Sequence, residues 1–151
     1  MISHVIARET YTEVIGDVKP FLKEHWEELS LYSDIPLDPE LEMYADLDRM
    51  GHLAAYTVRS DGKLVGYALY FVRKNPHYRN HIWALSDVVL VRKAYRQAGL
   101  GMALYDFIEA DLKARGVHVI HTFTKTEHPE LAMLLRARGH TEAELGFSLR
   151  L

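Results

Sequence analysis

The sequence of 151 residues contains no cysteine. Disulfide bonds, thiolate nucleophiles and sulfur-ligated zinc sites are therefore excluded, and the lack of cysteine fits a reducing compartment. No apolar run approaches the ~20 residues that a membrane-spanning helix requires. The first residues also lack the basic segment and apolar core of an export signal. We expect a cytoplasmic protein with no membrane partner.

An excess of positive charge is missing as well. Lysine and arginine together number 18 and aspartate and glutamate 21, so the formal net charge is -3. Nucleic-acid-binding domains usually carry a basic surplus, and we expect no nucleic-acid partner. Nine histidines are present, but His118 and His121 are three apart on a predicted strand and would point to opposite faces. No ligand set converges in the sequence, so we expect no metal site.

The pattern of apolar residues predicts a mixed α/β fold. The length suits a single domain over residues 1–151, because no linker or internal repeat divides the chain. Helical spacing of apolar residues predicts helices at residues 14–30, 40–50, 100–115 and 129–138. Strands are expected at residues 2–9, 53–59, 63–72, 81–91, 117–123 and 147–151, with a polar loop at 73–80. We expect a mostly antiparallel, twisted sheet flanked by helices.

Two glycines open the third predicted helix immediately after an apolar strand. The strand ends in Val88-Val89-Leu90-Val91, a run that indicates burial on both faces. The connection that follows contains Arg96-Gln97-Ala98-Gly99-Leu100-Gly101. Helix N-termini leave backbone N–H groups unpaired and carry the positive end of the helix dipole, so this loop can hold a diphosphate. An ordinary strand-to-helix turn could contain the same glycines, and spacing alone leaves both interpretations open.

Two other phosphate-binding motifs fit the loop poorly. A nucleotide P-loop would continue with Lys and Ser or Thr, whereas Met102 and Ala103 follow Gly101. The dinucleotide fingerprint would need Gly or Ala at Leu104, and it normally follows the first strand of a longer fold. Neither motif describes the loop.

Residues 90–101 resemble motif A of the GCN5-related N-acetyltransferases, whose core is Arg/Gln-x-x-Gly-x-Gly/Ala. Arg96, Gly99 and Gly101 match the core. Tyr95 supplies the aromatic residue before the arginine, and Val91 the valine five residues before it. The predicted order of elements is also similar to that of the family over most of the chain. The resemblance implies the acyl-CoA N-acyltransferase fold and acetyl-CoA as co-substrate.

The resemblance also implies which residues bind the co-substrate. The backbone around Val89 and Val91 would pair with the pantetheine arm of acetyl-CoA. Backbone amides would hold its pyrophosphate, and the residues concerned are Arg96, Gln97, Ala98, Gly99, Leu100 and Gly101. The strand at 81–91 would splay from the strand at 117–123, and the thioester would lie in the gap between them. The acceptor would enter from the opposite side.

Acetyl transfer requires a neutral amine, and Asp87 is the first candidate for the general base that provides it. A lysine-like amine with a pKa of ~10.4 is neutral in about one molecule in 2,500 at pH 7, a penalty of roughly 4.6 kcal/mol. Alternation along the strand would place Asp87, Val89 and Val91 on one face. Desolvation there could raise the pKa of Asp87. A structural carboxylate that pairs with an arginine or accepts backbone N–H bonds near a loop is the alternative. His81, whose imidazole pKa is near neutrality, is the reserve candidate.

The proton donor is where the sequence departs from the family. Many members carry a tyrosine four residues before the glycine that ends the last helix, and counting back from Gly139 gives Leu135. His140 replaces the aromatic residue that usually follows this glycine. Because free thiols have a pKa of about 8.5, solvent could protonate the departing thiolate.

The expected function is acetyl transfer from acetyl-CoA to a primary amine by direct attack, since no cysteine is available for a covalent intermediate. A non-catalytic acyl-CoA-binding or sensing module is the alternative, which Leu135 allows. A third hypothesis is a protein-interaction domain, with a homodimer formed through the last strand. The acceptor, small molecule or protein, is left open because related folds acetylate unrelated amines.

Overall fold

A five-stranded sheet forms the centre of the computed structural model, which describes residues 3–151 apart from the side chains of Gln97 and Ala98. The strand order is β1-β2-β3-β4-β5, and neighbours are antiparallel except for β4 and β5, which are parallel. The elements in chain order are β1 (His4–Glu9), α1 (Tyr11–Leu29), α2 (Leu41–Arg49), β2 (Leu53–Ser60), β3 (Lys63–Asn75), β4 (Tyr78–Val91), the 3₁₀ helix η1 (Lys93–Ala98), α3 (Leu100–Ala114), β5 (Val119–His121) and α4 (Pro129–Ala137). The predicted mixed α/β class with a mostly antiparallel sheet is confirmed.

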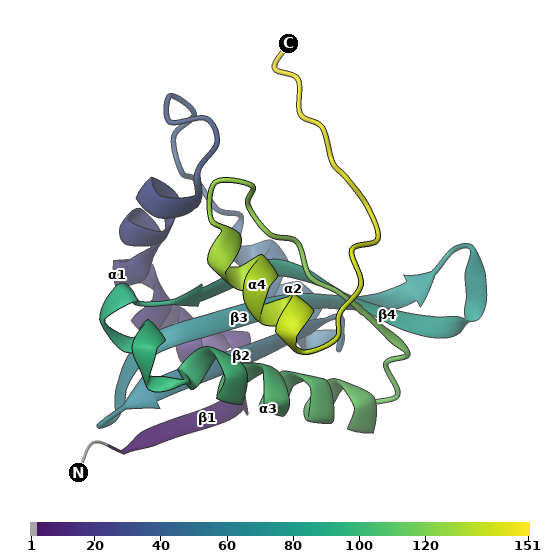
Figure 1. Ribbon diagram of the computed structural model, residues 1–151, viewed down its shortest axis with the longest axis horizontal. Helices are drawn as coiled ribbons and strands as arrows, with labels where there is room; N and C mark the ends of the chain where they lie inside the picture. Colours follow the sequence, from purple (N-terminus) through teal and green to yellow (C-terminus); the bar gives the residue numbers. More distant parts are fainter. Residues whose placement is uncertain (1–2) are drawn as a thin grey trace.

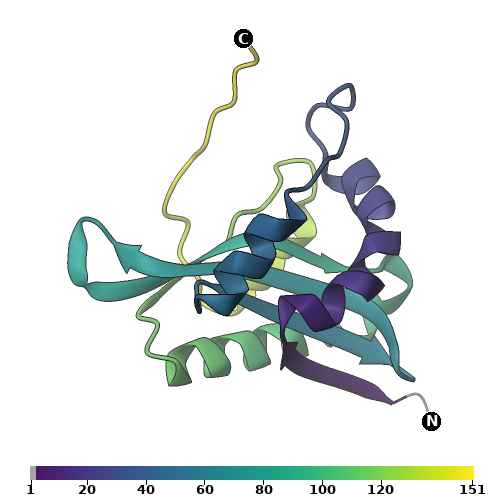
Figure 2. The ribbon, with the colours of Figure 1, turned by 180° about the vertical axis from the view of Figure 1, so that it is seen from behind.

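Helices cover both faces of the sheet (Figures 1 and 2). On one face, Leu104, Ile108 and Leu112 of α3 are fully buried in a core cluster with side chains of β2 and β3. On the other face, α1 contributes Val14 and Phe21 to a second cluster, with partly buried side chains of α2 at its edge. Apolar residues at helical spacing produce both contacts, because each helix has one stripe to bury.

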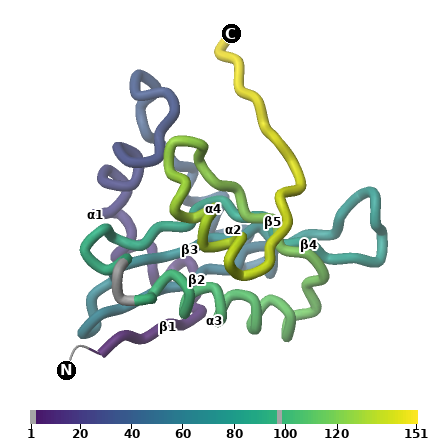
Figure 3. Tube along the Cα trace, viewed as in Figure 1, coloured from purple at the N-terminus to yellow at the C-terminus, as the bar shows by residue number. Residues whose placement is uncertain are grey.

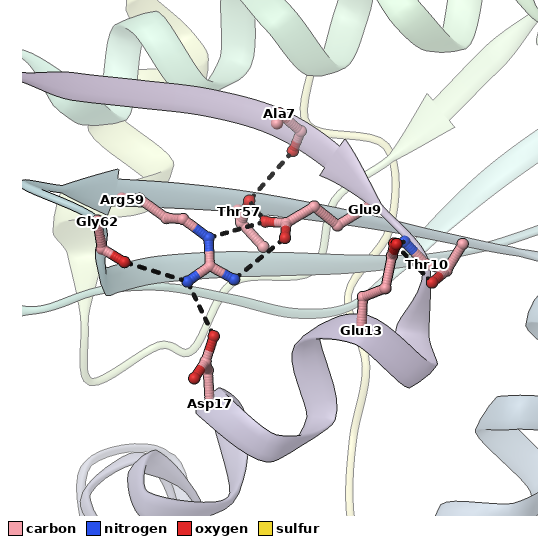
Figure 4. Close-up of polar contacts among 8 residues, drawn as sticks. All are labelled: Ala7, Glu9, Thr10, Glu13, Asp17, Thr57, Arg59 and Gly62. Atoms are coloured by element: carbon pink, nitrogen blue, oxygen red, sulfur yellow. Dashed lines mark hydrogen bonds and ion pairs between the residues drawn. The ribbon is translucent and has the colours of Figure 1, made fainter.

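Polar contacts fix the start of α1 against the edge of the sheet (Figure 4). The backbone N–H of Thr10 donates to the carboxylate of Glu13 at 2.9 Å, which caps the first turn. The Arg59 guanidinium of β2 donates to Glu9 of β1 at 3.1 Å and to Asp17 of α1 at 2.8 Å. One side chain therefore ties three elements together.

A β-bulge in β4 changes the faces that its side chains occupy. Leu69 of β3 pairs with Val88, but Tyr70 pairs with Ser86, so Asp87 is the extra residue. Val88 beyond the bulge lies in the cluster on the α1 side, whereas Val89 and Val91 pack with the α3 cluster. The Asp87 carboxylate bonds instead to Tyr44 of α2. The prediction that Asp87 shares a face with Val89 and Val91 is wrong, because strict alternation fails at a bulge.

The polar stretch predicted as a loop at residues 73–80 is mostly strand. β3 continues to Asn75 and β4 begins at Tyr78, so only Pro76 and His77 connect them. The resulting hairpin extends beyond the rest of the sheet, at the right of Figure 1. The prediction is wrong because it used polarity alone, and polar residues form strands readily where cross-strand pairs hold the register.

The C-terminal residues differ most from expectation. β5 spans only Val119–His121, and residues 147–151 form no strand within the described chain. They extend away from the body (Figure 3), with Phe147 94% and Leu149 82% exposed. The apolar alternation is that of a strand, but no strand among residues 3–151 pairs with it.

No helix within residues 3–151 is both long enough and apolar enough to cross a membrane. Over the same residues, no group of three histidine, aspartate or glutamate side chains converges as metal ligands do.

Candidate functional site

A cavity of about 300 Å³ opens where β4 and β5 separate. The two strands pair only between residues 83–85 and 119–121. Just beyond, the backbone N–H of Phe123 donates to the Ser86 hydroxyl at 2.8 Å. The cavity walls come from α1, β4, α3, α4 and the segment after β5, and the lining residues include Glu28, Asp87, Val88, Val89, Leu90, Val91, Gly101, Tyr105, Phe123, Lys125 and Leu134. Because residues from both helical layers line it, the cavity passes through the sheet.

The N-terminus of α3 borders this cavity without a capping side chain. Gly99, the N-cap, has a φ of 72°, a left-handed conformation that favours glycine. The first helical bond links Ala103 N–H to the Gly99 carbonyl at 3.1 Å. No acidic residue stands in the first turn to balance the helix dipole. The free amides of this turn can therefore hold an anion such as a pyrophosphate.

Gly101 allows a close approach between α3 and α4. A Cβ at this position would lie 2.9 Å from the Leu134 Cδ1 atom, which is closer than side-chain carbons pack. Because Gly101 has no side chain, its backbone forms the cavity wall at this position. The loop fits a phosphate group held by main chain.

The structure gathers part of the predicted cofactor set around the cavity. Val89, Val91, Arg96 and Gly101 line it. Gly99 is exposed at the tip of the turn, and Leu100 is 5% exposed in the α3 core, so its side chain serves packing. Two predicted residues, Gln97 and Ala98, lie outside the described side chains.

The Arg96 side chain joins the end of β4 to α1. Its Nε donates to the Val91 carbonyl at 2.6 Å, and its Nη2 donates to the Glu28 carboxylate at 2.6 Å. His128, before α4, shares a hydrogen bond of 2.7 Å with the Glu28 carbonyl. Glu28 thus connects α1 to both walls of the cavity, a role that no local sequence pattern signals.

Asp87 lies on the cavity wall and bonds to Tyr44. The Tyr44 hydroxyl donates to Asp87 Oδ2 at 2.8 Å. Burial raises the pKa of the Asp87 carboxyl above its ordinary value, and the hydrogen bond from Tyr44 opposes this rise. Among the described residues Asp87 has no arginine or lysine within ion-pair distance. Its surroundings therefore suit a proton acceptor better than a structural ion pair.

Three tyrosines lie near this carboxylate, and a histidine contacts one of them. Tyr11 stacks on Tyr44, with ring centroids 5.4 Å apart. Burial first, and then the charge of Asp87, raise the pKa of Tyr11, Tyr44 and Tyr67. His25 Nδ1 and the Tyr67 hydroxyl share a hydrogen bond of 2.6 Å, and burial lowers the pKa of His25 to about 4. His25 is thus neutral at pH 7, and sequence analysis had no signal that links these residues to Asp87.

The reserve base, His81, lies on the β3–β4 hairpin, six positions before Asp87. Its ring is 4.7 Å from the ring of His118, and it is not among the residues that line the cavity. The structure therefore does not bring the two candidate bases together.

Leu135 stands where many family members have a tyrosine, and its side chain is in the core with 7% exposed. A different phenol, Tyr105 of α3, lines the cavity. The Tyr70 hydroxyl donates to the Tyr105 hydroxyl at 3.3 Å and lies 3.0 Å from the Thr122 hydroxyl. Burial raises the pKa of Tyr105, so the phenol stays protonated. Sequence analysis missed Tyr105 because it lies within the apolar stripe of a helix.

Comparison with known proteins gives one family and many related folds. The model of the acetyltransferase (GNAT) family matches residues 18–139. No curated protein matches the sequence.

Solved structures resemble the chain over nearly its whole length. A ribosomal-protein-alanine N-acetyltransferase from Brucella melitensis biovar Abortus 2308 has a TM-score of 0.75 at 17% identity, covering 99% of both chains. An aminoglycoside acetyltransferase from an uncultured soil metagenomic sample has a TM-score of 0.78 at 20% identity, covering 99% of both. A predicted acetyltransferase with acetyl-CoA from Clostridium acetobutylicum has a TM-score of 0.77 at 13% identity, covering 99% of this chain and 96% of that one. At these identities the likeness shows a shared fold.

Proposed function

Because the chain belongs to the acetyltransferase (GNAT) family and is an N-acetyltransferase, we propose that it transfers acetyl from acetyl-CoA to a primary amine by direct attack. The cavity through the sheet carries this proposal. It has uncapped helix amides on one wall and Asp87, with a raised pKa, on another. A diphosphate and an amine could thus approach the same space from different sides.

The residues around the cavity suit acetyl-CoA. The first turn of α3, with Gly99 and Gly101, would hold the pyrophosphate, and the backbone of residues 89–91 would pair with the pantetheine arm. When bound, acetyl-CoA supplies the activated acetyl group. Asp87 would accept the proton of the attacking amine, and the hydrogen bond from Tyr44 would keep the carboxylate oriented.

The departing thiolate needs a proton or a hydrogen bond. Solvent is sufficient because a free thiol has a pKa of about 8.5. Tyr105 lines the same cavity and would donate a hydrogen bond to the sulfur while remaining protonated. The missing hydroxyl at Leu135 favours the second candidate, a module that binds acyl-CoA without turnover.

A second copy of this chain is the proposed partner for the C-terminal segment, residues 145–151. Its apolar side chains alternate with polar ones and stand in solvent, with Leu145 81% and Phe147 94% exposed. Such a segment gains stability by pairing with a sheet edge of another molecule. We therefore expect a homodimer formed through the C-terminal segment.

Calorimetric titration tests the function directly. Acetyl-CoA should bind, whereas pantetheine, which lacks the pyrophosphate, should bind far more weakly. Gly99→Trp should abolish binding because tryptophan is strained at a φ of 72° and blocks the amides. Thiol release with a panel of primary amines then distinguishes the enzyme from the module that only binds. Equal binding of acetyl-CoA and pantetheine would contradict the proposal that this loop binds the pyrophosphate. Unchanged affinity for acetyl-CoA in Gly99→Trp would contradict it as well.

A further inference from the structure

The β3–β4 hairpin concentrates positive charge in a chain whose net charge is negative. Arg73 and Lys74 lie on its first strand and Arg79 on its second. No acidic residue occurs between Asp61 and Asp87. The hairpin extends past the helices that cover the sheet (Figure 2). Its charge is therefore available to a partner.

The arginines of the hairpin differ from most others in the molecule in their lack of an ion pair with a described residue. Arg59, Arg92, Arg96 and Arg138 each pair with a carboxylate at 3.1 Å or less. Within the part of the chain that the structure describes, Arg73 and Arg79 form no ion pair. Both are exposed. An anionic partner could neutralise them without breaking an internal contact.

A row of rings, hereafter the ring ladder, leads from this hairpin to the cavity. Tyr78 and Trp83 stack with centroids 5.8 Å apart and planes inclined by 8°. The Trp83 ring lies 4.7 Å from His121, and His121 lies 6.4 Å from Phe123. Phe123 is 57% exposed and lines the cavity. The ring ladder thus connects the cationic hairpin to the site of the chemistry.

The two ends of this track carry opposite charge. Glu28, Asp87 and Glu130 line the cavity together with the cations Arg96 and Lys125. Because Arg96 is paired with Glu28, Asp87 and Glu130 are left with Lys125 alone as a cationic neighbour on the wall. Arg73 and Arg79 stand at the far end. The cavity therefore favours an amine, and the hairpin favours carboxylates. Together they match an elongated molecule with one positive and one negative end.

We propose that the hairpin and the ring ladder dock an acidic peptide whose amine is acetylated in the cavity, so that the acceptor is a protein with an acidic segment. This inference rests on the proposed function. Asp87 lies four residues from Trp83 and eight from Arg79 along β4. At ~3.3 Å per residue these separations are at most about 13 and 26 Å, since β4 has register shifts at Asp87 and between Tyr78 and Ile82. The carboxylates should therefore lie about four to eight positions from the amine. Small polycationic amines would gain nothing from the hairpin.

Peptide binding can be measured without turnover. The probe is a peptide with an acetylated N-terminus, Asp or Glu at positions four to eight and a C-terminal fluorophore, and the readout is anisotropy. The comparison peptide carries Gln at those positions. Wild type should bind the acidic peptide about tenfold more tightly, and Arg79→Glu should remove this preference. Lys63→Glu, the same charge change at an exposed site at the start of β3, is the matched control and should retain it.

Turnover gives the second measurement. With unblocked peptides, kcat/KM should favour the acidic peptide about tenfold in wild type and in Lys63→Glu. The preference should vanish in Arg79→Glu, while acetyl-CoA affinity is unchanged. Three results would overturn the docking surface. The acidic and Gln peptides could bind equally, or the preference could survive in both Arg73→Glu and Arg79→Glu. The substitutions could also change only the oligomeric state.

The two proposals fail in different ways. If acetyl-CoA does not bind but the blocked acidic peptide still binds in a hairpin-dependent manner, the docking surface holds and the transfer reaction is wrong. If acetyl-CoA binds and neutral peptides are acetylated as fast as acidic ones, the reaction holds and the docking surface is wrong.

Discussion

At the level of single residues, the surroundings of Asp87 set its proton affinity by two opposing effects. Burial raises the pKa of its carboxyl, and the hydrogen bond from Tyr44 lowers it. A base with a raised pKa binds the proton of an amine more strongly than an ordinary aspartate does. The hydrogen bond matters as well, because it opposes this rise and favours the ionised carboxylate.

Asp87→Asn removes the proposed proton acceptor. We expect kcat/KM with an amine acceptor to fall by about 10²–10⁴-fold at pH 7. The loss should shrink at alkaline pH, where the amine is already neutral. The pH profile of both proteins checks this, with acetyl-CoA affinity as the control for folding. An equal loss at both pH values would instead assign Asp87 a structural role.

Tyr44→Phe removes the hydrogen bond that lowers the pKa of Asp87. The pKa of the carboxyl should therefore rise further, so more alkaline solution is needed to ionise it. The acidic limb of the kcat/KM profile should move to higher pH, with little change on the alkaline plateau. Tyr32→Phe is the matched control, because the Tyr32 hydroxyl contacts Ser148 rather than the site. A limb that moves to lower pH contradicts the assignment.

At the level of elements, contacts between α3 and α4 hold one wall of the cavity. The Arg138 guanidinium, just after α4, donates two hydrogen bonds to the Glu109 carboxylate of α3, at 2.9 and 2.8 Å. His140 Nε2 lies 2.9 Å from the same carboxylate. Only 10% of the Arg138 side chain is exposed. On the same two helices, Leu134 lies close to Gly101, which belongs to the proposed phosphate loop.

Glu109→Gln should destabilise the protein in a pH-dependent way. The hydrogen bond from Arg138 lowers the pKa of Glu109 below its ordinary value. The stabilisation is therefore present above the unfolded pKa of ~4.3 and is lost as pH falls through the lower folded pKa. Since Glu109 is partly exposed, we expect a loss of roughly 1 kcal/mol at pH 7.

Urea unfolding of wild type and Glu109→Gln at pH 7 and at about pH 3 checks this linkage. The difference in the free energy of unfolding should narrow at the lower pH, because pH 3 lies below the unfolded pKa and part of the stabilisation from the ionised Glu109 is then lost. A difference that widens toward acid would refute the assigned sign. Glu142→Gln, which removes an exposed ion pair with Arg136, serves as the control and should change little.

At the level of the whole molecule, the family match confirms the resemblance inferred from residues 90–101, and the element order confirms the fold class. The C-terminal segment stands apart from this body. Tyr32 and Ser148 share a hydrogen bond of 2.5 Å, which holds the segment near the α1–α2 connection by a polar contact. Its apolar face is left without a partner in the described chain.

Removal of residues 145–151 should shift a dimer to a monomer. Phe147→Asp tests the same surface without shortening the chain. It should also weaken the dimer, because burying an unpaired charge in an apolar contact is unfavourable. Sedimentation velocity over a range of concentrations measures the result. The exposed variant Met133→Asp, at 63% exposure on α4, is a control that should stay dimeric. A wild type that remains monomeric at every concentration contradicts the proposed homodimer.

Much of the element order could be predicted from the sequence, because the signals are local. Apolar residues at helical spacing predicted α3, and the strands predicted at 53–59 and 63–72 match β2 and β3. The turn between them contains Asp61 and Gly62, whose φ angles are 48° and 80°. The structure gives Gly99 a left-handed φ and places Gly101 close to Leu134, and the binding of a pyrophosphate by this loop stays a prediction. Hairpin length and the C-terminal segment were not predicted, because strand pairing is a non-local contact.

The sequence by itself determined the helices, the turn glycines and the family motif at residues 90–101, since each depends on neighbours along the chain. The tertiary structure decided where Asp87 points. The bulge opposite Leu69 and Tyr70 turned its carboxylate to the face of Tyr44. Register between strands follows from packing across the whole sheet, and no local pattern encodes it. The pairing of β4 with β5 is likewise a non-local contact, and it brings the rings of the ring ladder together beside the cavity.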